Sequence, residues 1–311
     1  MATSGSVDYN VTGTAIVIEA MELIGAIAAG ETLTAHDGAS CLRSLEMMIK
    51  HWQAEGIGLW RNKEAALFLS YEGYSFSVGP TGDHCSTTWV KTEIATAASS
   101  GDATITVDDD TGVLDGDYIG VELDDYSLQW TTVDGDPVAN VITLDAVLTD
   151  DVAVDNHVYT YTTLISRPLE IIEARLHRAS GSDIPMKIIS LDEYTRLSTK
   201  TTTGVPNQIY YDPQQINIKV KIWPACNDVQ DYIKVIFRLA IEDVDALTNN
   251  ADFGQEWLLP LAWNLAVLIA PKFGVNFSQA NLYLAREMKK NASNFDMEQT
   301  SVFFESNLSG Y

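Results

Sequence analysis

The spacing of apolar residues changes three times along this chain of 311 residues. Between residues 14 and 56 they recur every three or four positions, which predicts helices. From Leu67 to about residue 240 they alternate with polar residues in short runs bounded by turn residues, which predicts strands. Helical spacing returns after Asp252 and continues to about residue 295. The pattern therefore predicts a mixed chain with helices at both ends and strands between them.

Two helices are predicted before residue 57. The segment TGTAIVIEAMELIGAIAAG consists of good helix formers and ends at Gly30, which suits a left-handed cap, so the first helix is expected over about 14–29. Thr34 can cap a second helix, which Gly56 ends. The two faces of this second helix are an apolar stripe of Leu42, Leu45, Ile49 and Trp52 and a polar face of Arg43, Glu46, Lys50 and Gln53 that points away.

A strongly acidic β segment follows. Between Ala95 and Ile165 there are 15 acidic residues and no Lys or Arg. The β-branched runs ATITV, DYIGVEL, WTTVDGDP, NVITL and HVYTYTT are separated by Asp-Gly turns, at residues 115–117 and 134–136. Asp and Gly tolerate the positive φ values of tight turns, so part of the acidity reflects turn chemistry. The segment is expected to be a small antiparallel β domain inserted into the chain.

The remaining chain is predicted to contain further strands and then helices. The runs RPLEIIEARLH, INIKVKIWP and YIKVIFRLAI read as strands, and Ser190 with Glu193 makes a capping box ahead of one short helix. Residues 201–204 are expected to be a mobile loop. Asp252 and Glu256 are expected to open an apolar helix that runs through Ile269. Ser278 is expected to open a last helix with one face formed by Leu282, Ala285, Met288, Ala292 and Phe295.

These elements define the expected fold class and division of the chain. The fold class is α+β: a helical body of about four helices, an antiparallel β region, and an inserted acidic antiparallel β domain. The expected parts are 1–84, an N-terminal helical pair and extended segment; 85–165, the inserted acidic β domain; 166–248, a β-rich region with a short helix; 249–300, the C-terminal helices; and 301–311, a C-terminal docking tail.

Composition narrows the classes of function. The 43 acidic and 19 basic residues give a net charge of −24, which disfavours broad adhesion to nucleic acid or anionic membrane, because phosphate binding requires clustered cations. The start of the chain lacks the pattern of a secretion signal, so export is not indicated. The apolar run from Trp257 to Pro271 is shorter than the ~20 residues that cross a bilayer, which predicts a buried core helix. The three cysteines, Cys41, Cys85 and Cys226, are expected to be reduced and structural.

No catalytic or metal-binding motif is recognisable. The five histidines have no zinc-type spacing, and there is no G-x-S-x-G, P-loop or dinucleotide-binding pattern. His84 and Cys85 are neighbours on a predicted strand and should point to opposite faces, which favours a structural reading. The acidic run at 108–117 fails the EF-hand pattern, because Val107 and Thr111 stand where the first Asp is required. A looser calcium site and a pair of hydrolytic carboxylates remain open alternatives. No cofactor is expected.

The last residues contain the aromatic side chains of Phe303, Phe304 and Tyr311. Chain ends usually fray, so aromatic residues there either fold back on the protein's own core or dock on another chain.

The first helical pair and the late helix together resemble one family. The run ELIGAIAAGETLTAHDGASCLRSLEMMIKHWQAEGIGLW is similar to the opening of the head-to-tail adaptor, or head-completion, proteins of tailed bacteriophages, especially short-tailed ones. The positions that match that pattern are Leu23, Gly25, Thr34, Leu45, Met48, Trp52 and Gly56. The blocks YSFSVGP, RPLEIIEARLH, YYDP, IWP and DFGQEWLLPLAWNLAVLIAPKFG follow in the family's order. The resemblance covers residues 14–84 and 166–275, and the acidic segment from about 86 to 165 looks like an insertion.

The resemblance implies a structural, non-enzymatic virion protein. It implies a homo-oligomeric ring, commonly of twelve copies, that connects the portal to the tail at the portal vertex, is assembled in the host cytoplasm, and helps to retain packaged DNA. Implied partners are other copies, the portal protein, downstream tail, nozzle or fibre proteins, and DNA that passes without sequence-specific binding; no membrane is implied. Phe303, Phe304 and Tyr311 become the expected portal or partner interface. The expected helical scaffold is Leu42, Leu45, Ile49, Trp52, Trp257 and Trp263.

Charge constrains such a ring. Acids that line a passage repel DNA phosphates, so the polymer can slide. Copies that each carry −24 repel one another, so the contacts between them are expected to be apolar and aromatic, on the helical layer and the tail rather than on the acidic module. Two other classes remain: a virion module whose β insert binds a glycan or receptor, and a carboxylate-dependent hydrolase.

Overall fold

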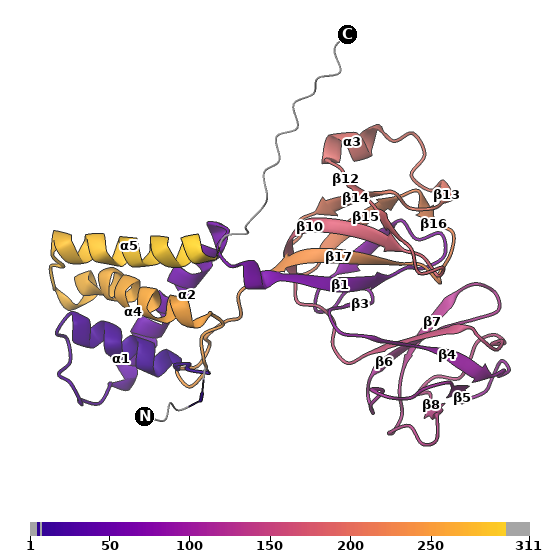
Figure 1. Cartoon of the computed structure of the whole chain (residues 1–311), viewed down its shortest axis with the longest axis horizontal. Coiled ribbons are helices and arrows are strands. Elements are labelled where there is room, and N and C mark those ends of the chain that lie inside the picture. The colour runs from indigo at the N-terminus through magenta and orange to yellow at the C-terminus, as the bar shows by residue number, and fades with distance from the viewer. Residues whose placement is uncertain (1–4, 7, 297–311) are drawn as a thin grey trace, which may run out of the picture. The chain divides into compact units, whose positions relative to one another are not determined.

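The computed structural model of the chain describes residues 5–6 and 8–296 (Figure 1). Within them the fold is mixed α+β, with five helices and several antiparallel sheets that include a curled half-barrel. The contacts divide the chain into two units. The first unit combines the described parts of residues 1–60 and 241–311, and the second is the continuous stretch 61–240.

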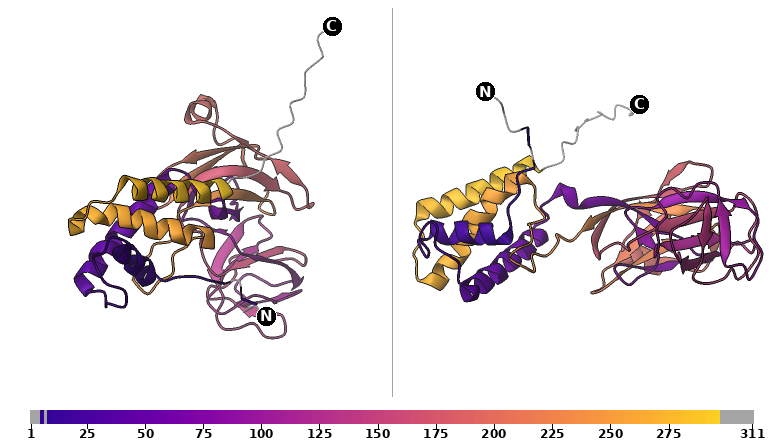
Figure 2. Two further views of the ribbon diagram at one scale, coloured as in Figure 1. Left: turned by 60° about the vertical axis from the view of Figure 1, so that its left-hand side comes forward. Right: turned by 90° about the horizontal axis from the view of Figure 1, so that it is seen from below.

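The first unit contains four of the five helices. They are α1 (Gly13–Leu23), α2 (Ala35–Ala54), α4 (Gln255–Ile269) and α5 (Gln279–Phe295), with the short 3₁₀ turns η1 (Leu59–Arg61) and η2 (Ala270–Phe273). In both views of Figure 2 the indigo and violet helices of the first 60 residues lie against the orange and yellow helices of the C-terminal segment. The two ends of the chain therefore build one helical core between them.

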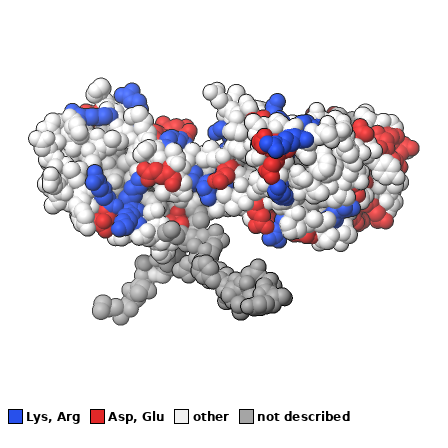
Figure 3. Space-filling model, turned by 90° about the horizontal axis from the view of Figure 1, so that it is seen from above, with Lys and Arg blue, Asp and Glu red and all other residues white. Residues whose placement is uncertain are grey.

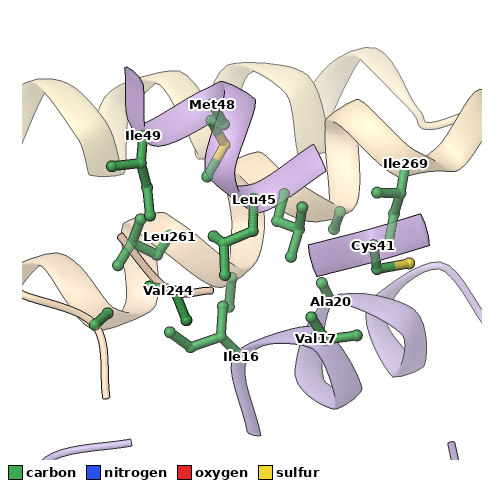
Figure 4. Close-up of a cluster of buried hydrophobic side chains, with 14 of the residues drawn as sticks. Ile16, Val17, Ala20, Cys41, Leu45, Met48, Ile49, Val244, Leu261 and Ile269 are labelled. Atoms are coloured by element: carbon green, nitrogen blue, oxygen red, sulfur yellow. The ribbon is translucent and has the colours of Figure 1, made fainter. Parts of the chain in front are cut away.

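The helical core is formed by the apolar faces of α1, α2 and α4. Ile16, Leu45, Ile49 and Leu261 are all fully or almost fully buried in it, and Figure 4 shows these side chains pointing toward one another. Trp257 lies in the same core and is 0% exposed. The spacing of three and four along α2 places its apolar stripe on the side that α1 and α4 cover.

α1 ends at Leu23, six residues before the predicted end at residue 29, so that part of the prediction is wrong. Gly25 adopts a φ of +71°, its N–H donates to the carbonyl of Glu22, and the N–H of Ala26 donates to the carbonyl of Met21. These two bonds form a Schellman motif, which satisfies the last carbonyls of the helix. The first glycine able to adopt a left-handed conformation therefore ended the helix.

Replacing Gly25 with alanine is expected to lower the free energy of unfolding by about 1 kcal/mol, because a Cβ disfavours this positive φ. Gly25→Asn should cost less, since Asn tolerates the left-handed region better. Urea denaturation followed by circular dichroism at 222 nm measures both. Equal stability of the Ala and Asn variants would contradict the assignment of this cap.

α2 begins at the predicted cap, where the Thr34 hydroxyl accepts a hydrogen bond from the N–H of Asp37. Its polar face does not point only to solvent. Glu46 accepts the N–H of Val244, Lys50 donates to the carbonyl of Ile241, and Gln53 accepts the Ile241 N–H. The face therefore holds the segment that re-enters the first unit at residue 241, a role that the periodicity of α2 did not predict.

α4 is the predicted apolar core helix, although its opening differs from the prediction. Its N-cap is Gly254, and Asp252 accepts the N–H of Glu242 instead of capping the helix. Asn264 is the polar interruption of the apolar run, and its amide donates to the carbonyls of Pro260 and of Ala285 on α5. A polar residue in this run therefore joins two helices.

α5 starts at the predicted cap, Ser278. Ala285 and Ala292 of its predicted face are buried, and Leu282 and Met288 are half-buried. Phe295, the last residue of α5, is 77% exposed.

The second unit contains the sheets. A five-stranded sheet has the order β11-β10-β17-β1-β3, a four-stranded sheet has the order β12-β14-β15-β2, and β13 pairs with β16. Their bounds are β1 (Asn62–Phe68), β2 (Ser75–Val78), β3 (Cys85–Ser86), β10 (Pro168–His177), β11 (Asp183–Pro185), β12 (Lys187–Ile188), β13 (Thr203–Gly204), β14 (Gln208–Asp212), β15 (Ile218–Trp223), β16 (Ala225–Cys226) and β17 (Tyr232–Leu239). The five-stranded and four-stranded sheets share one apolar core, which includes Leu67, Val220 and Phe237.

Strands far apart in the sequence pair directly in these sheets. β1 is antiparallel to β17, with Ala65 opposite Val235, and β2 is antiparallel to β15, with Phe76 opposite Val220. Residues 61–84 therefore belong with the second unit, whereas the sequence division grouped them with the N-terminal helices. The capping box of Ser190 and Glu193 opens α3 (Leu191–Arg196) as predicted. The expected loop at 201–204 contains β13, so that prediction is corrected.

The acidic segment forms a separate six-stranded sheet with the order β7-β6-β9-β4-β5-β8. Its strands are β4 (Val90–Thr96), β5 (Thr104–Val107), β6 (Tyr118–Glu122), β7 (Leu128–Thr132), β8 (Val141–Thr143) and β9 (His157–Tyr161). Gly116 and Gly135 adopt positive φ in the two predicted Asp-Gly turns. The sheet has its own apolar core, which includes Ile94, Ile119 and Val158.

Candidate functional site

An apolar groove lies between α2 and α4 in the helical unit. It has a volume of about 530 Å³ and is lined by Met47, Met48, Trp52, Val267, Leu268 and Pro271, together with Ser44, His51, Asn264 and Lys272. Met47 is 63% exposed and Leu268 is 45% exposed. Large apolar side chains gathered at that exposure are typical of a surface that another molecule covers.

The sequence builds this groove by placing apolar residues just beside the core stripe. Met48 and Trp52 line both the core and the groove. Met47 is one position before Met48 and lies outside the packed face. The Trp52 ring is fixed on the core side by Trp257, at a centroid distance of 5.7 Å, and is covered by the Lys289 ammonium group at 4.7 Å.

Lys272 closes one part of the groove. Its ammonium group donates to the hydroxyl of Ser44 at 2.5 Å and to the carbonyl of Ser40 at 3.2 Å, so its charge is held by α2. The groove therefore presents mainly carbon and sulfur atoms, with polar groups at its margins.

A second, smaller groove lies between α1 and α4. It has a volume of about 290 Å³, and its apolar lining includes Val11, Ile16, Leu258 and Leu259, of which Leu259 is 52% exposed. α4 thus contributes to two apolar surfaces of one helical unit.

The predicted scaffold residues do not all occupy the core. Leu45, Ile49, Trp52 and Trp257 are buried, and Leu42 packs at the edge of the same cluster. Trp263 is half-buried, and its ring contacts Phe277 at a centroid distance of 6.4 Å. The predicted interface residues Phe303, Phe304 and Tyr311 lie outside the described residues.

The second unit contains an aromatic cluster that the sequence analysis missed. His84 stacks on Trp130 at a centroid distance of 3.7 Å and an interplanar angle of 5°. Its Nδ1 atom lies 2.5 Å from the Tyr161 hydroxyl. Phe68 contacts Trp130 at 5.3 Å. The cluster joins β1 of the five-stranded sheet to β7 and β9 of the six-stranded sheet, three segments that are distant in sequence.

Burial in this cluster lowers the pKa of His84 to about 4, because desolvation disfavours the imidazolium. The folded pKa lies below the ordinary value of 6.5, so the folded state binds the proton less readily than the unfolded state between these pH values. The stability associated with neutral His84 is therefore complete above pH 6.5 and is lost as the pH falls toward 4.

Acidification is accordingly expected to weaken the fold through His84. The shift corresponds to at most about 3 kcal/mol, reduced to about 1–2 kcal/mol because the imidazole is only partly buried. Thermal melts of the native chain and of His84→Gln between pH 7 and 4.5 measure this, since glutamine carries no titrating charge. The native chain should lose more stability than the variant. Parallel curves would contradict the assignment.

Buried polar groups form a second contact between the same two β layers. Glu122 accepts the N–H of His157 at 2.9 Å and the side-chain amide of Gln230 at 2.8 Å. The Tyr159 hydroxyl donates to the carbonyl of Gln230 at 3.0 Å. Burial lowers the pKa of His157, aided by the nearby Lys91 charge. These bonds satisfy buried polar atoms, which would otherwise oppose folding.

The other candidate residues from the sequence lie in apolar cores, in the aromatic cluster or in turns. Cys85 lies in the core shared by the five-stranded and four-stranded sheets, whereas His84 lies in the aromatic cluster, as strand alternation predicts. All three cysteines are free and buried. In the run 108–117, Asp109 accepts the N–H of Thr111 and Asp117 accepts the N–H of Leu114, so these carboxylates stabilise turns. Among the described residues there is no group of three or more His, Cys, Asp or Glu side chains placed to hold a metal ion.

Within residues 5–6 and 8–296, no helix has both the length and the apolar character needed to span a bilayer. Comparison of the chain with protein-family models and with curated protein sequences gives no match.

Proposed function

We propose that this chain is a structural virion protein that forms a ring between portal and tail, helps to retain packaged DNA and gives the genome a passage. The observation that carries the proposal is the apolar groove between α2 and α4, because a ring subunit must present apolar surface to its neighbours. The residue blocks that resemble head-to-tail adaptor proteins support the same proposal. The pairing of the first and last helices in one unit also supports the proposal. In this proposal, the acidic 85–165 segment is an insertion into a body of helices and strands.

The balance of charge and apolar contact favours the groove as the subunit contact. Copies with a net charge of −24 repel one another, although salt screens exposed charges beyond ~8 Å. Stable protein contacts bury about 800 Å² on each partner and derive most of their free energy from a few large side chains near the centre. Met47, Met48, Trp52 and Leu268 are side chains of that kind, and they lie together.

The glycan-binding alternative has weaker support. Sugar rings bind on open aromatic faces, and the one tryptophan of the six-stranded sheet, Trp130, is stacked on His84. A pocket of about 290 Å³ beside this ring is lined by Ser70, Ser75 and Asp83 as well as by Phe68. The pocket therefore offers the edge of an aromatic cluster rather than a free platform.

The proposal is tested by the assembly state of the full chain. Mass photometry and negative-stain electron microscopy are expected to show rings for the native protein. Met47→Glu combined with Leu268→Glu should abolish them and leave the circular dichroism spectrum unchanged, because both side chains are exposed and glutamate is a good helix former.

A matched control places the same two charges on the second unit, outside residues 95–165. Leu191 and Ile216 are 55% and 68% exposed, and Leu191→Glu with Ile216→Glu should leave the rings intact. A native chain that stays monomeric at all concentrations, alone and with its cognate portal, would overturn the proposed function. Loss of rings in both double variants would show that added charge, rather than the groove, controls assembly.

A further inference from the structure

The C-terminal half of α5 carries a cationic hollow in this acidic chain. The hollow has a volume of about 320 Å³ and is lined by Arg286, Lys289, Lys290, Ser293 and Asn294 of α5, and by Glu55 at the end of α2. Figure 3 shows Lys and Arg beside Asp and Glu on the helical unit, at the left of that view, and mainly Asp and Glu at the far right of the view.

Two of the three cations in the hollow have no acidic partner among residues 5–6 and 8–296. Lys289 is neutralised by Glu55 at 2.6 Å and lies over the Trp52 ring. Arg286 and Lys290 are exposed, one helical turn apart, and make no ion pair within the described residues. Glu55 is the one carboxylate among the lining residues, and Lys289 already occupies it. The hollow thus retains unpaired positive charge and two neutral side chains able to donate hydrogen bonds.

We propose that this cationic hollow binds carboxylates from the 95–165 segment of a second copy of the chain. The inference rests on the proposed ring function and names one of its subunit contacts. The 95–165 segment contains 15 acidic residues and no Lys or Arg, and most of those acids are exposed. The two surfaces are therefore complementary in charge, and complementarity of this kind fixes orientation and partner choice.

A contact between two different surfaces has a geometric consequence. It is heterologous, so each copy uses its α5 hollow toward one neighbour and its acidic sheet toward the other. Contacts of this type repeat head to tail and close into a ring when the rotation allows. The apolar groove then contributes the larger part of the affinity, and the ion pairs set the register.

Nucleic acid is the rival ligand for Arg286 and Lys290. Two phosphate contacts give a salt dependence with a slope of only about −2, whereas proteins that bind DNA tightly make about 6–10 such contacts. The net charge of −24 also repels a polyanion. Two cations are enough, in contrast, to orient a protein contact that an apolar surface already stabilises. The charges therefore favour the second copy.

The test compares two double charge reversals in the full chain. Arg286→Glu with Lys290→Glu is expected to raise the concentration at which half of the copies assemble by at least tenfold in 50 mM salt, and by less in 500 mM salt. Lys63→Glu with Lys219→Glu makes the same change of charge at two other exposed cations, which lie on β1 and β15, and should leave assembly unchanged. Mass photometry measures both.

Cross-linking identifies the partner. An equal mixture of ¹⁴N and ¹⁵N copies is coupled with a carbodiimide, which forms an amide bond between an ammonium group and a carboxylate that touch. Mass spectrometry should find mixed-isotope links between Lys290 and acids of residues 95–165. The inference would be overturned if the native chain assembles but Lys290 is cross-linked only to residues outside 95–165, or to none. It would also be overturned if the Arg286→Glu, Lys290→Glu variant assembles normally.

The remaining outcomes separate this inference from the function on which it rests. A native chain that does not assemble removes the proposed ring and this inference with it. In another outcome the native chain assembles and the Arg286→Glu, Lys290→Glu variant assembles equally well, but this variant loses salt-dependent binding to duplex DNA in fluorescence anisotropy. That result would keep the proposed ring and assign the hollow to nucleic acid instead of a second copy.

Discussion

Replacement of Trp257 with alanine is expected to lower the free energy of unfolding of the helical unit by about 3–5 kcal/mol, the range for removing a large aromatic side chain from a core. Trp257 is fully buried and contacts Trp52, Phe253 and Trp60 at centroid distances of 5.7, 5.9 and 6.2 Å. Its removal leaves a cavity at the point where the N-terminal and C-terminal helices meet. Denaturation followed by circular dichroism at 222 nm measures the loss.

Trp257→Phe is the matched control for this prediction. The indole N–H of Trp257 has no hydrogen-bond partner in the described part of the chain, so phenylalanine removes an unsatisfied buried donor while it retains most of the ring. The Phe variant is expected to lose less than about 1.5 kcal/mol. Equal losses for Ala and Phe would mean that the cost arises from something other than the cavity.

The helices show how far local patterns predict this fold. The stripe of Leu45, Ile49 and Trp52 and the cap at Thr34 lie within one turn or a few turns of each other, so sequence spacing was sufficient to place α2. The end of α1 failed for an equally local reason. Both Gly25 and Gly30 have positive φ, and spacing alone does not say which glycine receives the Schellman bonds.

The sheets show what local patterns cannot supply. Alternation predicted that residues 75–78 and 218–223 form strands, but nothing within either run indicates that Phe76 lies opposite Val220. The assignment of residues 61–84 to the helical part failed for that reason. The polar face of α2 is a similar case, because its partners at residues 241–244 are about 190 positions away.

Residue spacing likewise predicted only the local part of each candidate site. Met48 and Trp52 could be placed on a helix face from their spacing, but the groove exists because α4, which is distant in sequence, forms its other wall. His84 and Trp130 come from separate strands and loops, and the stacking of their rings depends on the packing of two β layers. The cationic hollow likewise required α5 to lie against the end of α2.

Gly120 on β6 lies opposite Trp130 on the paired strand β7, and its replacement is the second change with a large expected effect on stability. A Cβ at this position would lie 2.8 to 2.9 Å from three atoms of the Trp130 ring. The ring cannot move away freely, since His84 stacks on it and Phe68 contacts it. Gly120→Ala is therefore expected to lower the free energy of unfolding by about 1–3 kcal/mol, the usual cost of overpacking a core.

Gly204 on β13 supplies the control, because a Cβ there would lie 3.4 Å from the nearest atom and its φ is negative or extended. Gly204→Ala should therefore change stability by less than about 0.5 kcal/mol. If the Trp130 ring is the cause, Gly120→Ala should cost much less in a Trp130→Ala background than in the native chain, because the clash is removed. Strictly additive losses in this double-mutant cycle would contradict the steric account.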